Sequence, residues 1–123
     1  MHAFMLQDWT TIRGSVSTVI QGEDNWLDLT EYQDVVLWID CREATANNVT
    51  ITFQTSPTKD EILFQTLATA STLVGQATPV VVNATLTKAV TPVARYLRWV
   101  IAGSGSPWDA TFRVLVAANS PGM

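Results

Sequence analysis

The chain has 123 residues, of which 47% are hydrophobic and 15% charged, so it can form an apolar core and lacks the charge density of a disordered protein. Its formal net charge of -4 argues against nucleic acid as a partner, because no basic surface is available to bind phosphates. We also expect no membrane span, because no apolar run approaches the roughly 18 residues that a spanning helix needs. Residues 1–9 lack the basic and apolar regions of a signal peptide.

Short segments in which apolar and polar residues alternate recur along the chain, whereas helical periodicity is almost absent. In chain order, this pattern predicts strands at about residues 11–20, 35–41, 49–55, 62–67, 79–86, 96–101 and 111–116. The alternation is clearest at 49–55, where Val49, Ile51 and Phe53 share one face. The segments 11–20, 62–67 and 79–86 are the weaker candidates, so the other four are expected to form the centre.

Turn-forming residues separate these segments and no linker divides the chain, which predicts one domain over residues 1–123. We expect an all-β fold, an antiparallel β-sandwich of about seven or eight strands. The side chains predicted to fill its core are Val35, Leu37, Ile39, Val49, Ile51, Phe53, Leu97, Trp99, Phe112 and Val114.

The two ends of the chain, residues 1–8 and 119–123, are expected to be loosely held. The N-terminal segment nevertheless contains an apolar cluster, Phe4, Met5 and Leu6. Two interpretations are open: the segment docks onto a neighbouring subunit, or it pairs along the edge of its own sheet and protects it.

Few residues could carry catalysis or bind a metal. His2 is the only histidine and Cys41 the only cysteine, which argues against a hydrolase triad, a zinc site and an internal disulfide. No glycine cluster matches a nucleotide-binding loop. An acidic segment could bind calcium, but its spacing differs from an EF-hand and favours a solvated loop; its residues are Glu23, Asp24, Asp28 and Glu31. We therefore expect no enzyme, no metal and no cofactor.

The five tryptophans exceed what a chain of this length usually carries. Trp99 alternates with core residues and is expected to be buried. For the others, three interpretations remain open: packing in the core or at element edges, a protein interface, or stacking against a sugar. The candidate interface residues are Phe4, Met5, Trp9, Trp26, Trp38 and Trp108.

Two segments resemble β-sandwich proteins of the jelly-roll type. Residues 35–58 read VVLWIDCREATANNVTITFQTSPT, and residues 94–101 read ARYLRWVI. Together they resemble the small jelly-roll decoration, or cement, proteins that attach to the outside of tailed-bacteriophage capsids. They also resemble, less specifically, the galactose-binding-like sandwiches that recognise carbohydrates or lipids.

The resemblance to decoration proteins implies a jelly-roll fold and a non-enzymatic protein that strengthens a capsid as an oligomer. Its partners would be the major capsid protein and copies of itself. It would be made in the host cytoplasm and located on the outer capsid surface of the virion. The alternative is a carbohydrate-binding module, for example in host-surface recognition, in which Trp26, Trp38 or Trp108 would stack against a glycan.

Overall fold

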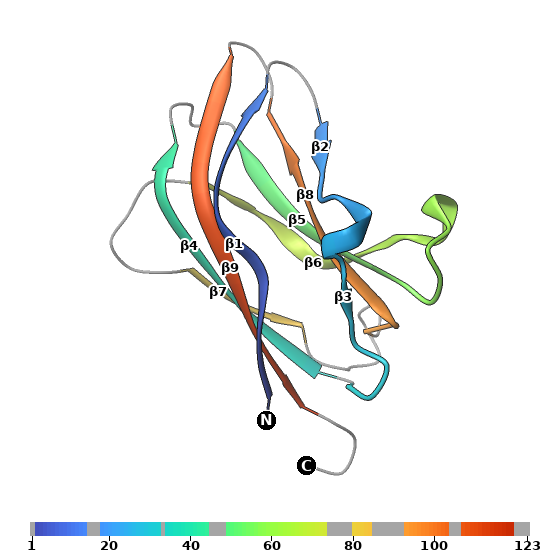
Figure 1. The fold of residues 1–123 in the computed structure, drawn as a ribbon. Coiled ribbons are helices and arrows are strands. Elements are labelled where there is room, and N and C mark those ends of the chain that lie inside the picture. The colour runs from blue at the N-terminus through green and yellow to red at the C-terminus, as the bar shows by residue number, and fades with distance from the viewer. Residues whose placement is uncertain are drawn as a thin grey trace.

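Two antiparallel sheets pack face to face, and their inward side chains form the core (Figure 1). This computed structural model describes residues 2–14, 18–32, 34–44, 49–73, 80–84, 93–103 and 107–119. Within these ranges, no helix is long and apolar enough to cross a membrane. The elements are β1 (His2–Gly14), β2 (Thr18–Ile20), η1 (Glu23–Asn25), β3 (Leu27–Asp28), β4 (Asp34–Ala44), β5 (Thr50–Ser56), η2 (Glu61–Leu63), β6 (Gln65–Thr72), β7 (Val80–Ala84), β8 (Tyr96–Ala102) and β9 (Trp108–Asn119), where η denotes a short 3-10 helix.

The strand order is that of a jelly roll, which confirms the predicted fold. One sheet has the order β1-β9-β4-β7, and the other has the order β2-β8-β5-β6. β3 follows β2 along β8, so β2 and β3 act as one interrupted strand, and the described residues then form eight strands. Counted this way, the first strand pairs with the last, the second with the seventh, the third with the sixth and the fourth with the fifth. A long antiparallel ribbon wrapped into two sheets produces this pairing.

All ten side chains predicted for the core are buried. The alternation predicted for residues 35–41 is confirmed in β4. Val35, Leu37 and Ile39 face inward because residues two apart in a strand share a face. Trp99 from one sheet meets Phe112 from the other, with ring centroids 5.5 Å apart in an edge-to-face contact. Burying each large apolar side chain contributes about 1.5–3 kcal/mol, so this core is the main source of stability.

The N-terminal strand begins much earlier than expected. Residues 2–8 were predicted to be loosely held, which is wrong: β1 pairs with β9 along its length, from His2 opposite Ala118 to Gly14 opposite Trp108. Leu6 is buried in the core, and this burial together with edge pairing holds the segment. Of the two interpretations of this segment, edge pairing within its own sheet is therefore the one that the structure supports.

Other strand boundaries also differ from expectation. The strand predicted at 11–20 is wrong, because residues 11–14 end β1 in one sheet and β2 lies in the other. The strand predicted at 62–67 begins only at Gln65, since Glu61–Leu63 form η2. The strand at 79–86 corresponds to β7 (Val80–Ala84), and its remaining residues lie outside the described ranges. At the C-terminus, Asn119 closes β9 and residues 120–123 are not described.

A buried polar bridge joins the two sheets near the middle of β1. The Gln21 side-chain amide donates to the carbonyl oxygen of Leu6 at 2.7 Å and to that of Asn25 at 3.1 Å. Its Oε1 accepts from the backbone N–H of Trp99 at 3.3 Å. The Trp99 indole in turn donates to Gln7 Oε1 at 3.1 Å. These bonds satisfy polar groups inside the sandwich and fix β1 relative to β8.

We predict that Phe53→Ala lowers the free energy of unfolding by about 3–5 kcal/mol, because it leaves a cavity between the sheets. Urea denaturation measures the change. Ile62→Ala is the matched control: it truncates an exposed aliphatic side chain and should change stability by less than about 0.5 kcal/mol. Equal effects of the two variants would contradict the central position of Phe53.

We predict that deleting residues 1–8 lowers the Tm of the isolated chain by at least about 5 °C, because it removes Leu6 from the core and unpairs part of β9. Met5→Ala, which truncates an outward side chain, should leave the Tm nearly unchanged. A deletion variant with the Tm of the full chain but altered self-association would instead show that the segment docks onto a neighbour.

Candidate functional site

One outward face of the sandwich carries apolar side chains in register across a whole sheet. Met5 of β1 pairs with Leu115 of β9. Trp38 of β4 pairs with Leu115 on one side and with Val81 of β7 on the other. Met5 is 49% exposed and Val81 50% exposed, whereas Trp38 and Leu115 are half-buried between them. Paired residues project from the same face of an antiparallel sheet, so these side chains form one row.

A second apolar row lies beside the first. Ala117 pairs with Ala3 on one side and with Val36 on the other. We call the two rows the apolar band, which consists of Ala3, Met5, Val36, Trp38, Val81, Leu115 and Ala117. With strands about 4.8 Å apart, the longer row spans about 14 Å. Outward faces of antiparallel sheets are usually polar, so an apolar patch of this kind indicates a contact surface.

An arginine-tryptophan cluster flanks the band. Asp40 is buried, and its two carboxylate oxygens accept from Arg42 Nε at 3.0 Å and Arg113 Nε at 3.1 Å. Both guanidinium groups lie over the ring of Trp9, at 5.8 Å for Arg42 and 4.9 Å for Arg113. Trp9 remains 42% exposed. Two guanidinium groups thus share one buried carboxylate and stack on one exposed tryptophan at this edge of the band.

Only some of the predicted interface residues lie together on one surface. Met5 and Trp38 lie in the apolar band, and Trp9 lies beside it. Phe4 faces the other way, packs against the core and makes an edge contact with Tyr32 at 5.4 Å. Trp26 belongs to the opposite side of the sandwich, as described below. The predicted set is therefore divided between two surfaces and the core.

Trp108 is not at an accessible edge, so its prediction as an interface residue is wrong, and of the three interpretations packing in the core is the one that the structure supports. It is 2% exposed and joins the core. It begins β9 and alternates inward with Ala110 and Phe112, which sets its direction. Gly103 leaves room for the indole, since a Cβ at position 103 would lie 2.3 Å from Trp108 Nε1.

The sequence interpretation missed the other members of the band because it treated outward positions as polar. The signal was present in residues 35–39 and 114–118, which are uninterrupted apolar runs. Such runs are typical of strands buried on both faces. In this chain they mark a sheet whose outward face is apolar as well.

A second cluster covers the outward face of the other sheet. Arg98 is 2% exposed, and Nε and Nη2 donate to Gln54 Oε1 at 2.9 and 2.6 Å. Nη1 and Nη2 donate to the Glu61 carboxylate at 2.6 and 2.8 Å. The guanidinium carbon lies 3.6 Å from the ring centre of Phe64 and 5.1 Å from that of Trp26. We call these five residues the Arg98 cluster.

The Arg98 cluster fixes both 3-10 helices to the sheet. Trp26 directly follows η1 and Phe64 directly follows η2, and their rings are in edge contact at 4.9 Å. Arg98 holds the pKa of the Glu61 carboxyl below its ordinary value of 4.5, because its hydrogen bonds and charge favour the ionised form. A buried arginine is acceptable here because its hydrogen bonds and aromatic contacts replace water.

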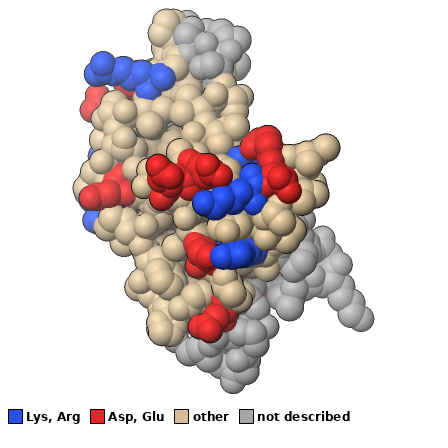
Figure 2. All heavy atoms as spheres, turned by 45° about the vertical axis from the view of Figure 1, so that its right-hand side comes forward, with Lys and Arg blue, Asp and Glu red and all other residues tan. Residues whose placement is uncertain are grey.

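Acidic side chains are spread over the side of the molecule that carries η1 and η2, with basic side chains between them (Figure 2). Asp28 is hydrogen-bonded to the Thr30 hydroxyl and to Arg95, which lowers the pKa of its carboxyl. Within the described ranges, no three His, Cys, Asp or Glu side chains converge as a metal-binding group. Cys41 is buried, and burial raises the pKa of its thiol.

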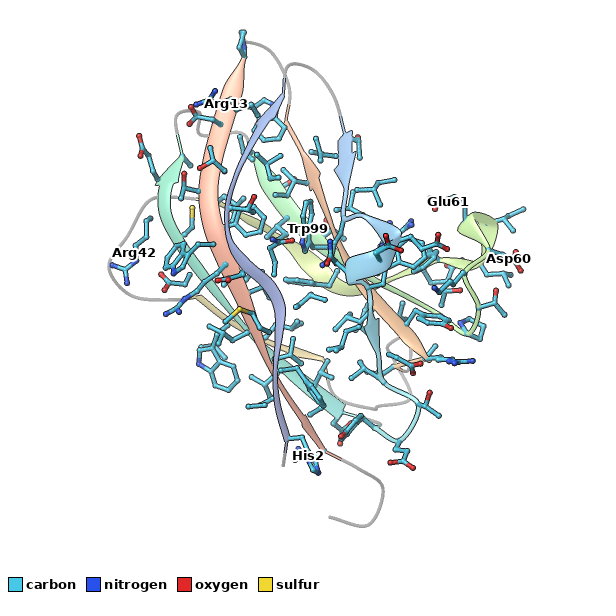
Figure 3. All side chains as sticks on the ribbon, in the orientation of Figure 1. His2, Arg13, Arg42, Asp60, Glu61 and Trp99 are labelled. Carbon is cyan, nitrogen blue, oxygen red and sulfur yellow. The ribbon has the colours of Figure 1, made fainter. Side chains whose placement is uncertain are left out.

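The apolar band and the Arg98 cluster lie on opposite sides of the sandwich. Figure 3 shows Arg42, which flanks the band, on the left and Glu61 of the Arg98 cluster on the right, with Trp99 between the sheets. The fold and these surfaces define a jelly-roll protein with two distinct outward faces.

No protein-family model and no curated protein sequence matches the chain. Among solved structures, it is similar to a chain in the structure of infectious bursal disease virus, Gx strain, with 11% sequence identity and a TM-score of 0.47. The similarity covers 98% of this chain but only 32% of that chain, so the chain spans about a third of its length. This level of similarity assigns neither a family nor a function.

We predict that Glu61→Gln destabilises the fold at neutral pH and that the difference from wild type shrinks on acidification. Because the pKa of Glu61 is lowered in the folded state, its contribution is present above the ordinary value of 4.5 and is lost as the pH falls through the lowered pKa. Urea denaturation of both proteins from about pH 7 to about pH 3 measures the difference. A constant difference over this range would contradict the role of the carboxylate.

Proposed function

We propose that the chain is a non-enzymatic structural protein of a virion, which decorates and stabilises a bacteriophage capsid as an oligomer on its outer surface. The jelly-roll order supports this proposal, because this architecture is common among viral capsid proteins as well as lectins. The resemblance of residues 35–58 and 94–101 to decoration proteins also supports the proposal. The same fold serves several functions, so the surface of the chain has to distinguish between them.

The apolar band is the observation that carries the proposal. Its side chains lie in register over neighbouring strands, and sheets of two sandwiches can pack face to face as the sheets within one sandwich do. We assign this face to contact between copies of the chain. The chain carries a net charge of -4, and two copies meeting at the band bring together residues that have no ionisable side chains.

The positions of the tryptophans give the carbohydrate alternative less support. Trp26 and Trp38 lie on opposite sides of the sandwich, and Trp108 is in the core. Trp108 is therefore not accessible to a glycan, and Trp26 and Trp38 do not form a joint surface for one. The exposed Trp9 is covered in part by two guanidinium groups.

We predict that Trp38→Lys abolishes self-association, because it places a charge at the centre of the band in both copies. Light scattering measures the oligomer, and the Tm should fall by only a few degrees. Thr11→Lys is the matched control, since Thr11 is exposed on the same sheet outside the band and should leave the oligomer intact. Imaging of purified capsids mixed with the wild-type chain should show ordered external density. A monomeric wild-type chain, or capsids without added density, would refute the proposal.

A further inference from the structure

The most exposed large apolar side chain among the described residues lies at the tip of η2. Ile62 is 87% exposed, and its neighbour Leu63 is 42% exposed. Figure 1 shows η2 projecting away from the two sheets, on the side opposite β4 and β7. We call these two residues the η2 tip. Water surrounds Ile62 almost completely, so it contributes little to the fold of the chain itself.

Hydrogen bonds hold the segment before the tip. The Ser56 hydroxyl donates to the carbonyl of Thr58 at 2.6 Å and accepts from the Thr58 backbone N–H at 3.2 Å. The Thr58 hydroxyl donates to the Asp60 carboxylate at 3.0 Å and accepts from the Asp60 backbone N–H at 3.2 Å. The Leu63 backbone N–H then donates to the carbonyl of Asp60 at 3.0 Å. This segment is therefore fixed by consecutive local bonds.

The Arg98 cluster holds the other side of the tip. Glu61, directly before Ile62, is bonded to Arg98, and the ring of Phe64, directly after Leu63, lies against the same guanidinium group. Both flanking side chains are thus turned toward the sheet while Ile62 is held outward. An apolar side chain presented on a rigid support loses little conformational freedom on binding, which is the property of an anchor residue.

The charge around the tip indicates the kind of surface it fits. Asp60 and Glu61 adjoin the tip on η2, and Glu23 and Asp24 belong to η1, which the Trp26–Phe64 contact places beside η2. Lys59 is the nearest basic residue in sequence and lies over the ring of Tyr96 at 5.5 Å. Glu61 is neutralised by Arg98, and the other carboxylates still outnumber Lys59, which favours a partner with basic residues and disfavours a second copy of this acidic chain.

We propose that the η2 tip is the anchor by which the chain attaches to the major capsid protein, inserting Ile62 into an apolar pocket bordered by lysine or arginine. This inference rests on the proposed function, since it takes the capsid as the partner. It assigns attachment to η2 and leaves the apolar band to contacts between copies.

The test measures binding of the fluorescently labelled chain to purified capsids that lack it. Ile62→Ser should weaken binding by at least about tenfold while the Tm and the oligomer are unchanged. Ile20→Ser is the matched control, because Ile20 is a 43% exposed isoleucine on the same side, and it should bind as wild type does. Wild-type binding should also weaken as salt rises, because charge attraction borders the pocket.

Two outcomes distinguish failure of the proposed anchor from failure of the proposed function. If the wild-type chain binds and Ile62→Ser binds within about twofold of it, the anchor is wrong while decoration of the capsid stands. If the wild-type chain does not bind capsids at all, the proposed function fails and the anchor fails with it. Binding that does not depend on salt would overturn the basic border of the pocket.

Discussion

The buried Gln21 side chain is the contact on which both outward surfaces depend. The hydrogen bond from its side-chain amide to the carbonyl oxygen of Leu6 holds β1 in place. This keeps the N-terminal part of the apolar band in register with β9. On the other side, the Gln21 side chain donates to the carbonyl oxygen of Asn25, and the backbone carbonyl oxygen of Gln21 accepts from the Trp26 indole at 2.8 Å, which together hold η1 over the Arg98 cluster. A buried amide with all of these bonds made fixes one arrangement of the two sheets, because any shift would leave buried polar groups without partners.

The two surfaces use different physical means. The apolar band is a flat sheet face, and the strength of a contact there depends on the area removed from water. The η2 tip is a small projection, so one side chain and the surrounding charge determine which partner fits it. Because the two surfaces lie on opposite sides of the sandwich, a partner at one does not obstruct the other (Figure 3). A protein that joins copies of itself while binding a different subunit needs such a separation.

The sequence predicted what depends on local alternation and missed what depends on distant contacts. Phe53 and Trp99 were placed in the core because a strand turns successive side chains to opposite faces. β1 was missed because register shifts within residues 5–10 interrupt its alternation. Trp108 was misplaced because its direction depends on where β9 begins. The Arg98 cluster could not be predicted, because it joins residues that lie far apart in the chain, and burial of an arginine has no signal in a single sequence.

The position of β9 between β1 and β4 constrains how the protein can be made. His2 pairs with Ala118, so β1 is synthesised long before β9, which is its one neighbour among the described strands of the sheet. Closing contacts between such distant segments is slow, because the chain loses much of its freedom before any contact forms. The band contains residues from both strands, so a truncated or nascent chain cannot present it. Under the proposed role of the band, a chain that lacks β9 is therefore excluded from contacts between copies without any separate check.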